Sequence, residues 1–136
     1  VIPINGYNAR KGHLASDKLV LTEDNYLELA NNSFSWQATS FIDNCMNRRV
    51  VFCGVSLTDA NMRRWLSWIH ANKMAEFKEN GLNCKDATEH FWIHKKPNTV
   101  QEKIWLEESV AHLGVRLVWI DEWNQTGEVL KKMLGL

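Results

Sequence analysis

The sequence has no net charge, no long apolar run and few cysteines, and each absence narrows the range of functions. Sixteen basic residues balance sixteen acidic residues, so no charge excess favours nucleic acid or an anionic membrane as a partner. No stretch approaches the roughly 20 apolar residues of a membrane span, and the chain does not start like a signal peptide. We therefore expect a soluble, cytoplasmic protein. Because the chain starts without methionine, we also expect it to begin inside a longer protein.

The three cysteines, Cys45, Cys53 and Cys84, form no Cys-x-x-Cys pair. An odd number of isolated cysteines is typical of reduced thiols in a cytosol. A structural zinc ion needs four ligands, and the histidines show no metal-ligand spacing that would supply them. We therefore expect no metal site.

Short apolar segments alternate with helical patterns, as is typical of a parallel sheet covered by helices. Four segments are predicted to be strands: Val1–Asn5, Val50–Gly54, Phe91–His94 and Val115–Ile120. The intervals between them are about ten residues or longer, which leaves room for crossover helices. We expect a single α/β domain over residues 1–136, with a parallel Rossmann-like sheet and helices on both faces.

Apolar residues at helical spacing predict the helices. The first follows a cap at Thr22. The next three carry apolar faces: Phe34, Ala38, Phe41, Ile42 and Cys45; then Met62, Trp65, Leu66 and Ile69; then Val100, Ile104, Val110 and Ala111. Lys73–Glu89 is interpreted as a helix end plus a surface loop. Thr99 is predicted to cap the fourth helix and Gly114 to end it, and Thr126–Leu134 is predicted to be a closing helix.

The segment Arg49–Leu66 joins the second predicted strand to a helix. Its Val50–Cys53 run is predicted to be buried on both faces of the sheet. Gly54 follows, where the missing side chain lets a ligand or another backbone approach closely. Either Ser56 or Thr58 is predicted to cap the helix. From these residues alone, an ordinary strand-to-helix connection is favoured over a ligand site.

The residue identities in this segment are more specific than its pattern of apolar and polar positions. GVSLTDANMRR, at 54–64, resembles the G-x-S-L-x-D-x-N-x-R-R segment of bacterial sirtuin-like proteins, the branch that hydrolyses NAD in anti-phage defence. Other segments agree with that family in order: VIPINGY with its strand ending in His-Gly, LVLTEDNYLEL with its Thr-x-x-x-Tyr segment, and HFWIHKK and LGVRLVWID with its last two strands. The resemblance covers nearly the whole chain but only the C-terminal part of such a domain, because the Gly-rich phosphate-binding turn is not in this sequence.

The resemblance implies NAD or ADP-ribose as the ligand and assigns roles to five positions. Asn5 occupies the position of the family's catalytic His, and an amide cannot accept a proton near neutral pH. This replacement indicates either a natural pseudoenzyme or an engineered inactivation. Gly54 and Ser56 match the Gly-x-Ser that approaches the adenosine ribose and phosphates. His94 and Asp121 end the third and fourth predicted strands, where a ligand crevice forms in open α/β sheets.

Three other polar residues of the motif are interpreted structurally. Asp59 favours a helix N-terminus, where the helix dipole attracts negative charge. Arg63 and Arg64 resemble phosphate binders in isolation, but they lie away from the apolar face of their helix. We therefore predict a solvated or interface role for both, and a smaller effect of Arg63→Ala on nucleotide binding than of changes at Gly54.

The function expected from the resemblance is cleavage of NAD to nicotinamide and ADP-ribose in an anti-phage defence protein, acting as a homo-oligomer or a subunit of a defence complex. This chain by itself is expected to be inactive. The alternative is a non-catalytic NAD- or ADP-ribose-binding domain that regulates assembly. A sirtuin deacylase is disfavoured, because those enzymes carry a four-cysteine zinc module between the two motifs and this sequence does not.

Overall fold

The computed structural model describes residues 23–24, 35–83 and 90–136. The chain divides into two compact units, residues 1–46 and 47–136. Helix α2, Trp36–Asn47, belongs mainly to the first unit and buries Ala38, Phe41 and Cys45, as its predicted apolar face requires. The predicted cap at Thr22 lies outside the described residues.

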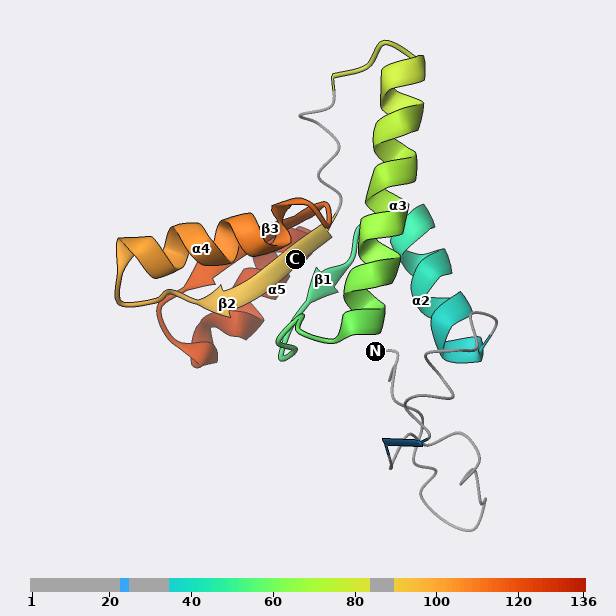
Figure 1. Ribbon diagram of the computed structural model, residues 1–136. Coiled ribbons are helices and arrows are strands. Elements are labelled where there is room, and N and C mark those ends of the chain that lie inside the picture. Colours follow the sequence, from blue (N-terminus) through green and yellow to red (C-terminus); the bar gives the residue numbers. More distant parts are fainter. Residues whose placement is uncertain (1–22, 25–34, 84–89) are drawn as a thin grey trace. The chain divides into compact units, whose positions relative to one another are not determined.

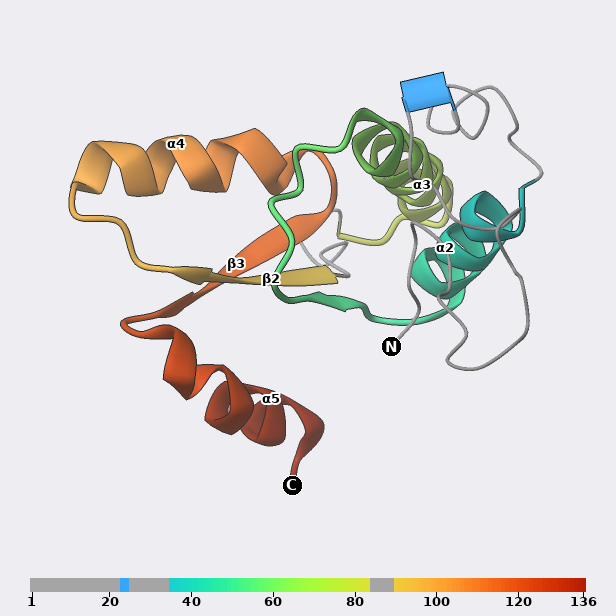
Figure 2. The ribbon, with the colours of Figure 1, turned by 90° about the horizontal axis from the view of Figure 1, so that it is seen from below.

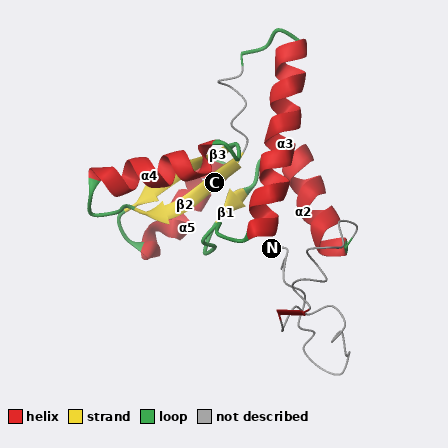
Figure 3. Cartoon of the chain, in the orientation of Figure 1, coloured by secondary structure: helices red, strands yellow, loops and turns green. Residues whose placement is uncertain are grey.

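The second unit is built on a parallel sheet of three described strands, β1 (Val51–Phe52), β2 (His90–Lys95) and β3 (Val115–Ile120), in the order β1-β2-β3 (Figures 1 and 3). Phe52 pairs with Trp92, which in turn pairs with Leu117. Helix α4 lies over one face of the sheet and α5 over the other (Figure 2). The predicted α/β fold with a parallel sheet and helices on both faces is therefore confirmed. The predicted strand Val1–Asn5 lies outside the described residues.

Strand β1 is shorter and less buried than the sequence predicts. Phe52 is buried, but Cys53 and Gly54 are exposed because the chain leaves the sheet after Phe52. The ladder begins one residue earlier, since the amide of Phe91 donates to the carbonyl of Val50 at 2.9 Å. Within the described sheet β1 is an edge strand and β2 is central.

The buried His90 fastens β1 to β2 with its side chain. Its Nδ1 accepts a hydrogen bond from the amide of Val50 at 3.3 Å, and its ring packs edge-on against Phe52. His90 therefore has a structural role in the sheet. The imidazole accepts from the amide of Val50, a donor that the short strand would otherwise leave unpaired.

Helix α3, Ala60–Glu79, is capped by Asp59 rather than by Ser56 or Thr58. The Asp59 carboxylate accepts from two amides of the first turn, each at 2.9 Å. Its predicted face, Met62, Trp65, Leu66 and Ile69, is buried. The helix ends at Glu79, inside the Lys73–Glu89 stretch that was predicted to contain the helix end, because the polar residues to Glu79 extend an already nucleated helix.

Helix α4, Val100–Ala111, begins at the predicted cap, where Thr99 Oγ1 accepts from the amide of Glu102. Its predicted apolar face is only partly buried: Val110 is 1% exposed, whereas Val100 is 74% and Ile104 44% exposed. The helix instead turns Lys103 and Glu107 toward β3. Glu107 accepts from the indole of Trp119 at 2.9 Å, and the Lys103 ammonium lies 5.9 Å from that ring. Long charged side chains thus cover an aromatic residue, as their aliphatic stems allow.

The chain closes with a short 3₁₀ helix, Trp123–Gln125, and α5, Thr126–Leu134, at the predicted bounds. The best-buried apolar residues of the second unit lie on α3, on the strands and at the α4–β3 corner, and include Leu66, Ile93, Val110 and Leu113. Among the described residues, no helix is both long and apolar enough to cross a membrane.

Gly114 forms the corner between α4 and β3 at φ +69°, which confirms its predicted role at the helix end. A Cβ atom there would lie 2.6 Å from Nδ1 of His70, a residue of α3. The missing side chain therefore meets two requirements, a left-handed backbone and the close approach of α3. Gly81, after the end of α3, has nearly the same φ of +67° but open space around it.

We predict that Gly114→Ala lowers the free energy of unfolding by about 2 kcal/mol or more, since backbone strain of about 1–2 kcal/mol adds to displacement of His70. Gly81→Ala bears only the strain, so it is the matched control and should cost less. Urea unfolding of both variants measures the difference. Equal destabilisation would mean that the His70 contact contributes nothing.

Candidate functional site

The carboxyl ends of the three parallel strands meet at one edge of the sheet, where ligand crevices form in open α/β folds. Gly54 and Ser56 follow β1, His94 is the penultimate residue of β2, and Asp121 follows β3 directly. The structure therefore brings these four predicted site residues to the same edge. The fifth, Asn5, lies outside the described residues.

Gly54 has φ +69°, and a Cβ atom added to it would meet no atom of the described residues within 4 Å. Packing among the residues that the structure describes therefore does not exclude a side chain at this position. Two reasons for glycine remain: the left-handed backbone, and space for a ligand or for another segment to approach. Because Gly54 is exposed, the space next to it opens to solvent.

Two hydrogen bonds hold the loop after Gly54 from the protein side. The indole Nε1 of Trp92 donates to the carbonyl of Val55 at 2.9 Å, and Nη1 of Arg63 donates to the carbonyl of Leu57 at 3.1 Å. Ser56, between these two carbonyls, is exposed. Its hydroxyl shares a 2.7 Å hydrogen bond with the hydroxyl of Thr58, so Ser56 retains further capacity to donate or accept.

The N-terminus of α3 follows this loop but is already occupied by a negative charge. Asp59 takes two first-turn amides, so an anionic phosphate placed on them would meet like charge. Asn61, 6% exposed, has a side-chain amide nitrogen with no hydrogen-bond partner among the described residues. The negative charge of Asp59 thus makes the N-terminus of α3 more suitable for neutral groups, such as ribose oxygens, than for a phosphate.

The ring of His94 has a defined hydrogen-bonding pattern. Nδ1 lies 2.8 Å from the carbonyl of Lys95, and because a carbonyl can only accept, Nδ1 carries the proton. In the neutral ring Nε2 is then an acceptor. Three indoles, of Trp92, Trp119 and Trp123, surround the ring edge-on with centroids 4.7 to 6.0 Å away. They fix the orientation of the ring.

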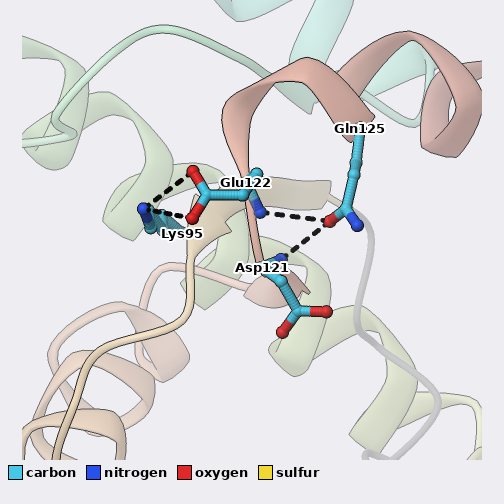
Figure 4. A network of polar contacts seen from close by, with 4 residues as sticks. All are labelled: Lys95, Asp121, Glu122 and Gln125. Carbon is cyan, nitrogen blue, oxygen red and sulfur yellow. Dashed lines mark hydrogen bonds and ion pairs between the residues drawn. The ribbon is translucent and has the colours of Figure 1, made fainter.

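Figure 4 shows how the turn after β3 leaves the carboxylate of Asp121 available. Oε1 of Gln125 accepts from the amides of Asp121 and Glu122, at 2.8 and 3.2 Å. Lys95 donates to both carboxylate oxygens of Glu122 at 2.9 Å, which joins the ends of β2 and β3. The carboxylate of Asp121 points away from this network and is exposed.

Sequence reasoning missed Trp92 and Arg63, the two side chains that hold the loop. Arg63 is half-buried and donates to two carbonyls, so the expectation of a solvated or interface role is wrong for it. Its neighbour Arg64 is exposed, as predicted. The signal that separates the two is helical phase, since Arg63 lies closer to the buried face marked by Met62 and Leu66.

A family model described as the SIR2-like domain matches residues 9–113, more than half of the chain. The chain belongs to the SIR2-like domain family. Neither the curated proteins nor the solved structures provide a match to this SIR2-like domain.

Because SIR2-like domains are NAD-related, membership of this family supports NAD as a ligand of this SIR2-like domain. The matched segment contains Gly54, Ser56 and His94, whereas Asn5 and Asp121 lie outside it. In the part of the chain that the structure describes, no three His, Cys, Asp or Glu side chains form a group that would hold a metal ion.

We predict opposite tautomers for two histidines of this SIR2-like domain. His94 should carry its proton on Nδ1 and His90 on Nε2, because the Nδ1 atoms donate and accept respectively. Nitrogen NMR at a pH about two units above the ordinary histidine pKa of ~6.5 reads both rings in one sample. The same tautomer for both would contradict the described hydrogen bonds.

Proposed function

We propose that this chain is the C-terminal portion of a cytoplasmic NAD hydrolase domain that cleaves NAD to nicotinamide and ADP-ribose in anti-phage defence. The observation that carries the proposal is Gly54, which has open space and a left-handed backbone at the carboxyl edge of a parallel sheet in a SIR2-like domain. The defence role and an oligomeric form, as a homo-oligomer or within a defence complex, rest on the resemblance of the GVSLTDANMRR segment.

The proposed ligand-binding residues are Gly54, Ser56, His94 and Asp121. Gly54 lets the ribose approach the backbone, and Ser56 binds a hydroxyl or phosphate oxygen. Nε2 of His94 accepts from a ribose hydroxyl, which matches the acceptor left by its Nδ1 bond. The exposed carboxylate of Asp121 accepts from another hydroxyl. Its charge, like that of Asp59, favours ribose over pyrophosphate nearby.

The proposed catalytic position is Asn5. Departure of nicotinamide leaves an oxocarbenium-like ribose. Water then attacks the ribose carbon that carried nicotinamide, and a base assists by accepting a proton from that water, which gives ADP-ribose. The amide of Asn5 cannot serve as that base near neutral pH. We therefore propose that the chain as given binds NAD or ADP-ribose without cleaving it.

A second candidate function is a non-catalytic NAD- or ADP-ribose-binding domain that regulates assembly, favoured by Asn5 at the position of the base. A deacylase is not proposed, since the sequence lacks paired cysteines for the zinc module. Both proposed functions require the nucleotide site, and only the first requires chemistry.

The first test of the proposal is Gly54→Asn. Asparagine tolerates a left-handed backbone, so the fold should persist while the new side chain blocks the ribose. We expect NAD and ADP-ribose affinity to fall by about tenfold or more, equal to ~1.4 kcal/mol. Titration calorimetry measures it.

The matched control is Gly81→Asn, which has nearly the same φ and open space but lies beyond the far end of α3. It should bind as tightly as the wild-type chain. If the folded Gly54→Asn variant also binds as tightly, Gly54 does not contact the ligand. If the wild-type chain binds neither nucleotide, the proposed function fails.

The second test restores a base with Asn5→His in a protein that also carries a Gly-rich phosphate-binding turn ahead of Val1. An imidazole with an unperturbed pKa of ~6.5 should raise the rate of nicotinamide release by roughly 10²–10⁴. NAD affinity should change little. Undetectable cleavage with intact NAD binding would favour the regulatory domain over the hydrolase.

A further inference from the structure

Arg63 and Arg64 are adjacent in the sequence but differ in their surroundings. Arg63, one turn into α3, is half-buried, and both terminal nitrogens of its guanidinium are engaged. Nη1 donates to the carbonyl of Leu57 at 3.1 Å, and Nη2 donates to the carbonyl of Ser109 at 2.8 Å. Two of the five N–H donors of the guanidinium are thereby used on carbonyls of the chain itself, which fixes the position of Arg63 within the protein.

The first of these hydrogen bonds acts on a backbone that needs support. Leu57 has φ +52°, the only positive φ of a non-glycine residue in the described ranges. Residues other than Gly, Asn and Asp adopt this conformation rarely, because Cβ approaches the following carbonyl. Its side chain is 1% exposed, so burial and the Arg63 hydrogen bond together hold Leu57 in this conformation.

The hydrogen bond from Arg63 lies on one side of Ser56, and the bond from Trp92 to Val55 lies on the other. The carbonyls on both sides of Ser56 are thus fixed by donors from the protein. The backbone of Ser56 takes its position from these two anchors, while its hydroxyl shares a hydrogen bond with the hydroxyl of Thr58 and accepts from the amide of Thr58. Removing either anchor frees the residue that the proposed function assigns to the ligand.

We propose that Arg63 is a positioning residue for the nucleotide: it holds the 54–58 loop in its ligand-binding conformation through the carbonyl of Leu57. This inference rests on the proposed function. The second hydrogen bond, to Ser109, fixes the guanidinium against the last turn of α4, so that the anchor does not move with the loop. A lysine has a single ammonium on a flexible stem and does not reproduce this planar fork.

The test compares Arg63→Ala and Arg63→Lys with Arg64→Ala, the matched control on the exposed side of the same turn. We expect Arg63→Ala to raise the Kd for ADP-ribose by about tenfold or more, the size expected for loss of a charged hydrogen bond. This effect equals that expected for Gly54→Asn and replaces the smaller effect expected from the sequence, because Arg63 donates to the carbonyl of Leu57 in the loop. Arg63→Lys should recover part of this affinity, and Arg64→Ala should change it by less than about twofold.

A purely stabilising role is separated from positioning by Gly81→Ala, which strains the backbone beyond the C-terminal end of α3, away from Arg63 and the loop. It should bind ADP-ribose as tightly as the wild-type chain. Methylguanidinium, at millimolar concentrations that do not denature proteins, should restore part of the affinity of Arg63→Ala only. Wild-type affinity in folded Arg63→Ala would overturn the proposal. If Arg63→Ala does not fold, wild-type affinity in Arg63→Lys would overturn it.

A readout without ligand keeps this test independent of the proposed function. The indole N–H of Trp92 bonds to the loop, so its NMR signal should shift in Arg63→Ala and stay unchanged in Arg64→Ala. Loss of one signal in Trp92→Phe assigns it. If the wild-type chain binds no nucleotide but this signal shifts, the proposed function fails and the loop anchor stands. An unchanged signal means that Arg63 does not hold the loop.

Discussion

The structure of the second unit depends on parallel pairing of β2 with both of its neighbours. Parallel strands cannot be joined by a tight turn, so the chain must cross over the sheet through α3 and then through α4. Each crossover returns the next strand in the same direction, and the three carboxyl ends meet at one edge. That geometry brings Gly54, His94 and Asp121 together although they are far apart in the sequence.

Local chemistry made much of the fold predictable. Strand β3 and helix α5 have the expected bounds, and α4 begins where expected. Gly114 makes the left-handed corner before β3, and Thr99 caps α4 with an effect that is confined to its own turn. The predictions failed where an element meets a distant partner. The exposed side of α4 was misassigned, because Lys103 and Glu107 are polar in the sequence yet cover Trp119.

The candidate site, too, was predictable only where the signal is local in the sequence. Gly54 and Ser56 were found from the sequence, since a strand, a glycine and a hydroxyl residue form a local pattern. The residues that hold them were not found, because Trp92 lies 37 positions from Val55, and Arg63 lies 46 positions from Ser109. Likewise, the sequence contains His94 but not its tautomer, which depends on the direction of the Lys95 carbonyl. Contacts of this kind exist only after the chain has folded.

The left-handed Leu57 has a consequence for protein engineering. Its backbone is held by a buried side chain and by a guanidinium fixed to another helix, so the loop's shape is not encoded in its own few residues. Grafting residues 54–58 onto another scaffold would transfer the glycine and the serine but not their arrangement. A transplant would need the first turns of α3 and the end of α4 as well, together with an indole placed as in β2.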